Sequence, residues 1–151
     1  MLTRGNFVMA QLETSVVAFP EAISGLTDEI LTFLKEQQVD GQAAYNTALV
    51  VEELMTNLGT HSTRKDEPVT VVITVEPAVV KGEIIDTAEP FDPTLAADPD
   101  LEGSLEERPV GGLGLYLARQ VSSLFEYTRR DGENWTTFAI ARTHDAIEGN
   151  A

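Results

Sequence analysis

The 151-residue sequence contains no cysteine and only two histidines, His61 and His144. Without thiols the chain can form no disulfide bond, no thiolate zinc site and no cysteine nucleophile. Two imidazoles also exclude a metal site built on several histidines. These absences remove disulfide-stabilised folds, multi-histidine metal centres and thiol catalysis from the functions that the sequence allows.

Basic residues are also scarce, with 10 Lys and Arg against 25 Asp and Glu and a net charge of −15. A field of this sign repels nucleic-acid backbones and anionic lipid surfaces, so we expect neither as a partner. No run approaches the roughly 20 apolar residues of a membrane helix. Residues 1–12 hold one basic residue and no long apolar run, so no secretory signal is expected. The sequence therefore predicts a cytoplasmic protein.

Apolar residues make up 42% of the chain, which is too many for a disordered acidic protein. Alternating apolar residues predict a strand within 7–19, and spacings of three and four predict a helix from Pro20 to Asp40. A second helix is expected over 42–61 and strands over 69–75 and 79–85. A third helix follows residue 112, and strands over 125–130 and 135–142 are joined by Asp131 and Gly132, a strong hairpin signal. This order predicts a single α+β domain, 1–151 with a core of about 7–142, built as a two-layer sandwich.

Residues 82–107 differ from the rest of the chain. They include nine acidic residues, three prolines and no basic residue. A loop of this length inside a compact domain is usually functional or mobile. The sequence motifs on its two sides therefore carry most of the functional argument.

The first candidate motif lies within residues 52–57 of the second expected helix. Glu53 and Asn57 are four residues apart and share one helix face. The Asn57 amide can give Mg²⁺ a hard oxygen ligand, and Glu53 can orient or deprotonate a nucleophile. The alternative interpretation is a solvated glutamate and an asparagine at a helix end.

The second motif begins at Asp86, directly after an apolar strand, and continues through Ala88 and Phe91. A carboxylate at this position can accept a hydrogen bond from an exocyclic amine such as that of adenine. The alternative is an ordinary aspartate that opens a turn at a strand end.

The third motif is Gly111-Gly112-Leu113-Gly114 at the start of the third expected helix. Glycines let the backbone approach a ligand, and the first N–H groups of a helix point at an anion. Arg108 lies just upstream and can reach a terminal phosphate. No Lys-Ser/Thr follows, so this is not a Walker A loop, and a glycine-rich loop needed only for packing is the alternative.

The order of the three motifs resembles the GHKL ATPase superfamily, which includes gyrase, histidine kinases and a mismatch-repair ATPase. Glu53-x-x-x-Asn57 is similar to its N box, the segment from Asp86 to Pro93 to its G1 box, and Gly112-Leu113-Gly114 to its G2 box. Residues 52–53, 90–93 and 111–115 resemble in particular the small bacterial anti-sigma-factor serine/threonine kinases. One departure is Ala88, which stands where the G1 box usually has glycine.

This resemblance implies the Bergerat fold, in which a mixed, mostly antiparallel sheet carries helices on one face. It implies ATP and Mg²⁺ as ligands and an ATP lid over about 88–111. Asn57 would coordinate Mg²⁺, Glu53 would act as general base and Asp86 would bind the adenine amine, while Gly112 and Gly114 would shape the lid hinge and the phosphate-binding helix start. The other residues implied for the nucleotide site are His61, Ala88, Phe91, Arg108, Gly111 and Leu113.

The resemblance also implies a function. The chain would phosphorylate an anti-anti-sigma factor of the STAS type on serine or threonine, sequester a sigma factor and form a homodimer. An alternative, motivated by Ala88, is a nucleotide-gated binding module of the same fold without significant kinase activity. A detached histidine-kinase catalytic domain is disfavoured because no helical hairpin carries a phosphoacceptor histidine, and the combined motifs disfavour a scaffold role.

Overall fold

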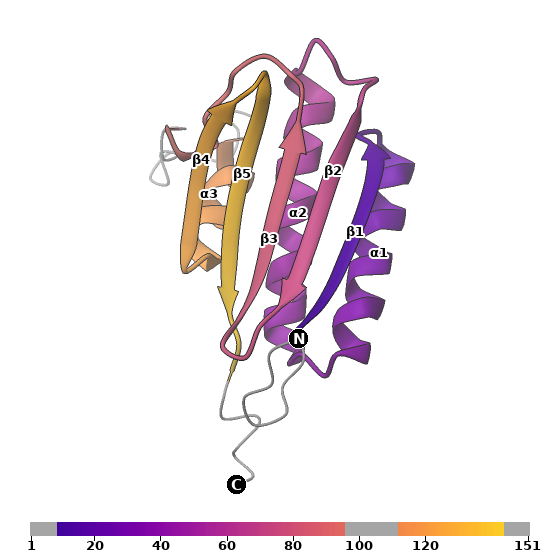
Figure 1. Ribbon diagram of the computed structural model, residues 1–151, viewed down its shortest axis with the longest axis vertical. Helices are drawn as coiled ribbons and strands as arrows, with labels where there is room; N and C mark the ends of the chain where they lie inside the picture. The colour runs from indigo at the N-terminus through magenta and orange to yellow at the C-terminus, as the bar shows by residue number, and fades with distance from the viewer. Residues whose placement is uncertain (1–8, 96–111, 144–151) are drawn as a thin grey trace, which may run out of the picture.

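The protein, described here from a computed structural model for residues 9–95 and 112–143, contains one five-stranded sheet. The sheet order is β1-β2-β3-β5-β4, and every neighbouring pair is antiparallel (Figure 1). The elements in chain order are β1 (Ala10–Val17), α1 (Pro20–Glu36), α2 (Gly41–His61), β2 (Pro68–Val75), β3 (Val79–Asp86), the 3₁₀ turn η1 (Pro93–Leu95), α3 (Gly112–Val121), β4 (Leu124–Arg130) and β5 (Glu133–Ala141).

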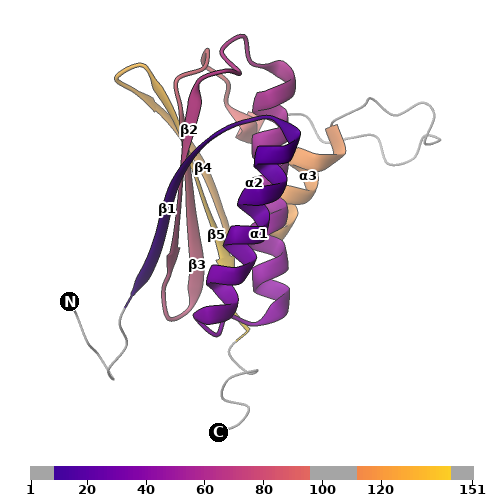
Figure 2. The same ribbon diagram turned by 90° about the vertical axis from the view of Figure 1, so that its right-hand side faces the viewer.

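The three helices lie on one face of the sheet (Figure 2). Apolar residues at helical spacing on α1 and α2, including Ile30 and Met55, are fully buried against inward-facing strand residues such as Ile73 and Phe138. Burial of this apolar area is the main stabilising contribution to such a layer. The predicted α+β two-layer sandwich is confirmed.

Two local features show why the sequence folds in this way. Asp131 and Gly132 have φ values of 50° and 79°, the positive pair that a tight two-residue hairpin turn requires. In β3, a Cβ atom at Gly82 would lie 2.2 Å from the Phe138 ring, so the missing side chain makes room for the largest buried residue of the core. The turn sets the pairing of β5 with β4, and the Gly82–Phe138 contact fits β5 against β3.

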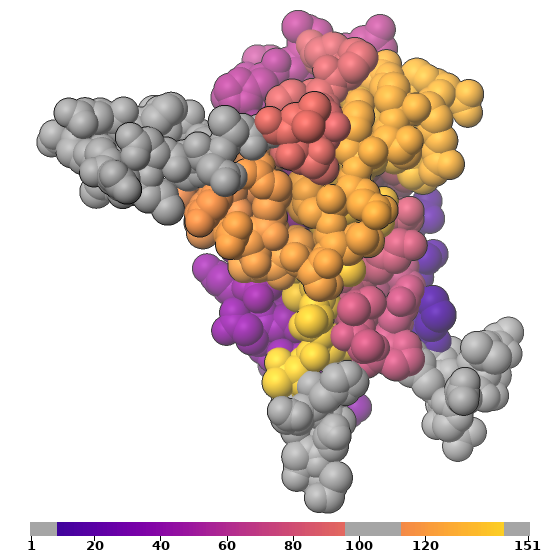
Figure 3. Space-filling model, turned by 90° about the vertical axis from the view of Figure 1, so that its left-hand side faces the viewer, coloured from indigo at the N-terminus to yellow at the C-terminus, as the bar shows by residue number. Residues whose placement is uncertain are grey.

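The connection after β3 lies on the side of the molecule shown in Figure 3, where η1 sits beside α3 and β4. The Arg119 guanidinium of α3 donates a hydrogen bond of 3.4 Å to the Pro93 carbonyl. Within the parts of the chain that the structure describes, no helix is long and apolar enough to cross a membrane.

Candidate nucleotide-binding site

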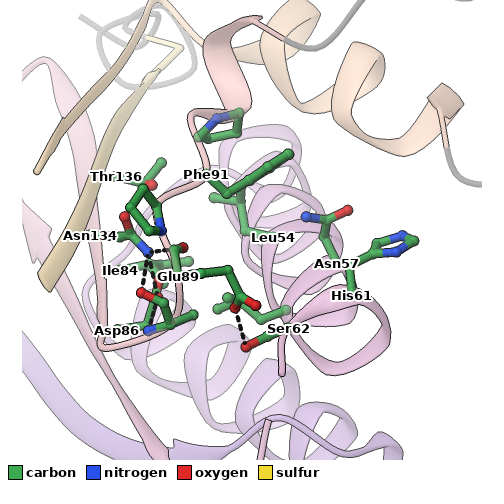
Figure 4. Close-up of a pocket in the computed structure, with 14 residues that line it drawn as sticks. Leu54, Asn57, His61, Ser62, Ile84, Asp86, Glu89, Phe91, Asn134 and Thr136 are labelled. Carbon is green, nitrogen blue, oxygen red and sulfur yellow. Dashed lines mark hydrogen bonds between the residues drawn. The ribbon is translucent and has the colours of Figure 1, made fainter. Parts of the chain in front are cut away.

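A pocket of about 130 Å³ opens between the C-terminal half of α2 and the ends of β3 and β5 (Figure 4). Its remaining wall is the connection from β3 to η1. Pockets for whole small-molecule ligands usually measure about 300–1,000 Å³. A pocket of this size suits one ring system of a larger ligand rather than the complete molecule.

Asp86, the last residue of β3, lies in this pocket and is only 7% exposed. Its Oδ1 accepts hydrogen bonds from the Ala88 N–H and from Asn134 Nδ2, both at 2.9 Å. These are its hydrogen bonds within the described residues, so Oδ2 is left as an acceptor for a ligand. Burial raises the pKa of Asp86, while the Asn134 amide, the Ala88 N–H and the charge of Arg129 act in the opposite direction.

Asn134 is a site residue that the sequence motifs do not include. It lies opposite Asp86 in the β3–β5 register and is 3% exposed. Its Nδ2 also donates to the carbonyls of Ala88 and Glu89, at 3.3 and 3.1 Å, and its Oδ1 accepts from Tyr127 Oη and Arg129 Nη1, at 2.5 and 3.0 Å. The available sequence signal is that Asn134 and Thr136 occupy the inward face of β5, where alternation predicts apolar residues.

Ala88 is 6% exposed and lines the same pocket. The positive φ angles found in the described part of the chain belong to Gln38, Asp131 and Gly132. Ala88 therefore adopts ordinary backbone geometry, and the departure from glycine at this position introduces no left-handed strain.

Glu89 fastens the β3–η1 connection to the end of α2. Its two carboxylate oxygens accept hydrogen bonds from the hydroxyls of Ser62 and Thr63, at 3.0 and 2.7 Å, and both accept from the Thr63 N–H (Figure 4 draws the bond to Ser62). The Thr63 hydroxyl, with the other donors, lowers the pKa of Glu89 to about 2. The first residues of the predicted lid are thus tied to the pocket wall.

The α2 wall of the pocket carries Asn57 and His61, which are one helical turn apart. Figure 4 shows them as neighbours on the side opposite Asp86 and Asn134. Among the described residues, neither side chain has a hydrogen-bond partner. Phe91, also predicted for the site, lines the pocket and is 46% exposed.

Glu53 lies one turn before Asn57 but does not line this pocket. Its carboxylate packs against the first turn of α3, where a Cβ atom at Gly114 would come within 1.9 Å of Oε1. Burial, followed by the charge of neighbouring Glu52, raises the pKa of Glu53. The sequence predicts the shared helix face, but it does not predict that α3 would cover the glutamate.

The glycine motif lies at the start of α3, which begins at Gly112. Leu113 is the second residue of the helix, and its side chain is 40% exposed. Gly114 follows one position later and makes the close contact with Glu53. Arg108 and Gly111, the other two residues predicted here, lie outside the described residues. Their roles stay predictions.

The described residues contain no group of three or more His, Asp and Glu side chains that could hold a metal ion alone. The half-buried amide of Asn57 offers one unengaged oxygen in the pocket. Mg²⁺ is commonly held by one or two protein oxygens together with water and substrate phosphates. The side chains present fit that arrangement and do not fit a site made by the protein alone.

Residues 16–140 match the family model described as the histidine kinase-like ATPase domain. The chain belongs to this family. It is 31% identical over 106 residues to the serine/threonine-protein kinase BtrW of Bordetella bronchiseptica, a match that covers 69% of this chain and 72% of BtrW. The predicted relation to the GHKL kinases is thereby confirmed.

Two solved structures share the fold of this family member. One contains the RsbU and RsbW domains of Rv1364c from Mycobacterium tuberculosis, with a TM-score of 0.63 and 15% identity over 89% of this chain. The family member spans 33% of that longer chain. The other is the SiaB–SiaC complex from Pseudomonas aeruginosa, with a TM-score of 0.54 and 17% identity, covering 86% of this chain and 89% of the matched one.

Proposed function

We propose that this domain binds ATP with Mg²⁺ and transfers the γ-phosphoryl group to a serine or threonine of an anti-anti-sigma protein of the STAS type. The observation that carries the proposal is the Asp86 carboxylate, which is buried, saturated at Oδ1 and left with Oδ2 in a ring-sized pocket. An acceptor of this kind recognises the exocyclic amine of adenine. Membership of an ATPase family and similarity to a named serine/threonine kinase support the same reading.

The α2 wall supplies groups suited to the phosphates. The Asn57 amide oxygen would hold Mg²⁺, which when bound neutralises charge on the transferred phosphoryl group. His61, on the next turn, is within the same wall and is a candidate phosphate contact. Because neither side chain is engaged by another described residue, both can turn toward a ligand without breaking a hydrogen bond.

Glu53 is the candidate general base for the acceptor hydroxyl. A carboxylate whose pKa is raised accepts a proton more effectively near neutral pH than an ordinary glutamate does. The phosphoryl group passes from the β-phosphate oxygen to the hydroxyl oxygen, and the hydroxyl proton passes to Glu53. Positioning and charge neutralisation supply most of the rate in such transfers.

Partner binding completes the proposal. The chain would sequester a sigma factor as a homodimer, and phosphorylation of the anti-anti-sigma protein would decide which partner is held. The similarity to BtrW and to the fold of the SiaB–SiaC complex supports the choice of this class of kinase. Nucleic acid and membranes are not proposed as partners, since the net charge of −15 disfavours both.

A second candidate function is a nucleotide-gated binding module without significant kinase activity. The contact between the Glu53 carboxylate and Gly114 favours it, because this carboxylate packs on α3 rather than facing the pocket. In this case ATP would order the site and control partner binding, and no phosphoryl group would move.

The experiment that separates the two candidates compares Glu53→Ala with Glu52→Ala, the exposed neighbour on the same helix. ATP·Mg²⁺ binding is measured by calorimetry, and transfer from radiolabelled ATP to a STAS-domain protein is measured in parallel. For the kinase, Glu53→Ala abolishes transfer with affinity nearly unchanged. Glu52→Ala keeps the affinity and most of the transfer, since burial and not Glu52 is the main cause of the raised pKa of Glu53. ATP binding without transfer by the unmodified chain would favour the binding module. Absence of binding at millimolar ATP would overturn both.

A further inference from the structure

The Asn134 side chain connects the surface of β4 to the carboxylate at the base of the pocket. Two donors from β4, Tyr127 Oη and Arg129 Nη1, meet its Oδ1. On its other end, Nδ2 faces acceptors, the nearest being Asp86 Oδ1 at 2.9 Å. This buried amide therefore has donors on one side and acceptors on the other.

That arrangement allows one orientation of the amide. In the present orientation Nδ2 lies 2.9, 3.3 and 3.1 Å from Asp86 Oδ1 and the carbonyl oxygens of Ala88 and Glu89. If the amide were rotated by 180°, its oxygen would face these three acceptors instead. Its NH₂ group would then face the hydroxyl and guanidinium donors of β4. Buried polar groups left without partners cost about 1–3 kcal/mol each, so the observed orientation is strongly preferred.

We propose that Asn134 is a positioning residue of the nucleotide pocket, which holds the Asp86 carboxylate charged and turned so that Oδ2 selects a base with an exocyclic amine. The inference rests on the proposed binding of ATP. It assigns base selectivity to Asp86 and Asn134 together, with Tyr127 and Arg129 fixing the amide. Burial raises the pKa of Asp86, and the Asn134 donor opposes this shift, so loss of that donor moves the balance toward the neutral carboxyl. A neutral carboxyl can donate to a base carbonyl and no longer discriminates against it.

Other charged groups near Asp86 contribute to any pH dependence. They come from α2, from the α2–β2 connection, from the β3–η1 connection and from β4. These groups are His61, Arg64, Lys65, Glu67, Glu89 and Arg129. All six are unchanged in a variant at position 134, so the difference between that variant and the unmodified chain isolates the contribution of Asn134.

The sharpest variant is Asn134→Asp, which keeps the shape and replaces the donor by an acceptor. Asn46→Asp on α2, which retains an acceptor for Gln42, is the matched control. Binding of ATP·Mg²⁺ and of ITP·Mg²⁺, which has a carbonyl in place of the amine, is measured by calorimetry from pH 5.5 to 8.5. Thermal unfolding is followed for each variant.

Two carboxylates this close raise each other's pKa, so a shared proton restores a donor between them at low pH and is lost as the pH rises. We expect Asn134→Asp to bind ATP at least about tenfold more weakly than the unmodified chain at pH 8.5 and within about threefold of it at pH 5.5. Asn46→Asp should follow the unmodified chain throughout. An Asn134→Asp profile parallel to that of the unmodified chain, whether equal or uniformly weaker, would overturn the inference, because a purely structural role predicts no proton-dependent recovery.

Tyr127→Phe provides an independent test if Asn134→Asp unfolds. It removes one of the two donors that fix the amide, and Tyr45→Phe, at an exposed tyrosine of α2, is its control. We expect the ratio of ATP to ITP affinity to fall about threefold in Tyr127→Phe only, from the loss of one hydrogen bond. An unchanged ratio would contradict the role of β4. Failure of the unmodified chain to bind ATP would instead refute the proposed function.

Discussion

The two walls of the pocket differ in how fully their polar groups are engaged. On the strand wall, Asp86, Glu89 and Asn134 make hydrogen bonds to one another or to neighbouring backbone and hydroxyl groups. On the α2 wall, Asn57 and His61 have no side-chain partner in the described part of the molecule. The same pocket is therefore rigidly organised on one side and unengaged on the other.

The two walls would therefore divide recognition and chemistry between them. Hydrogen bonds formed during folding cost nothing further when a ligand binds, so the strand wall can supply affinity and base selectivity. Unengaged groups on α2 can instead adapt to phosphates and an ion that bring their own charges. Variants on each wall should therefore change different quantities.

The largest effect is expected on the strand wall, at Asp86. Asp86→Ala removes the proposed hydrogen-bond acceptor for the nucleobase. It also leaves the Asn134 Nδ2 and Ala88 N–H donors without the carboxylate oxygen to which they donate. We expect ATP affinity to fall by about 100-fold, consistent with the loss of a charged hydrogen-bonding group. Calorimetric titration measures the loss, with Asp92→Ala in the same connection as control. Retention of wild-type affinity would remove Asp86 from the site.

The next effect is expected on the α2 wall, at Asn57. Asn57→Ala removes the proposed Mg²⁺ ligand while the strand wall keeps its hydrogen bonds. ATP affinity is measured once in the presence of Mg²⁺ and once in the presence of a chelator. The ratio of the first affinity to the second should fall about tenfold, as expected when one metal-binding group is lost. Asn46→Ala, about three turns earlier on the same helix, should leave the ratio unchanged. Equal loss in both conditions would show that Asn57 contacts the nucleotide without the ion.

An effect of similar size, but on transfer and not on binding, is expected at the contact between α2 and α3. Gly114→Ala places a methyl group where Glu53 Oε1 now lies, and the flexible glutamate must turn away. We expect phosphoryl transfer to fall about tenfold while stability changes by less than about 1 kcal/mol, since alanine favours the helix. In a double-mutant cycle with Glu53→Ala, the two losses should not add. Additive losses would mean that the methyl group acts elsewhere.

The smallest effect concerns Glu89 and pH. Its folded pKa of about 2 lies below the ordinary value of 4.5, so its hydrogen bonds stabilise the fold above pH 4.5. This contribution is lost as the pH falls from about 4.5 to about 2. Glu89→Gln should therefore lower the melting temperature slightly at pH 7 and have little effect at pH 2. A difference that stays constant with pH would contradict this origin.

The sequence predicts those features that depend on local pattern. Helical spacing in α1, alternation in β5 and the Asp131-Gly132 turn suffice for the elements and their layers. Asp86 was also recognisable, because a carboxylate that ends an apolar strand is a local feature. Residue roles carried over from the resemblance, such as that of Arg108, stay predictions.

Features that depend on long-range register could not be predicted from the sequence. Asn134 becomes a site residue only because β5 pairs with β3 in a register that sets it opposite Asp86, 48 residues away. Glu89 is bound by Ser62 and Thr63 only because two connections meet at one end of the sheet. A shift of one residue in the β3–β5 register would turn the Asn134 side chain to the other face.

The insertion of β5 between β3 and β4 also has a consequence for synthesis. The chain reaches Asp86 and all of α2 well before it reaches the strand that completes the pocket. On the ribosome, the first three strands and two helices can leave the exit tunnel while Asp86 still lacks its Asn134 partner. A nascent chain therefore completes this pocket only after the β4–β5 hairpin has emerged, and protein truncated within β5 lacks the completed strand wall.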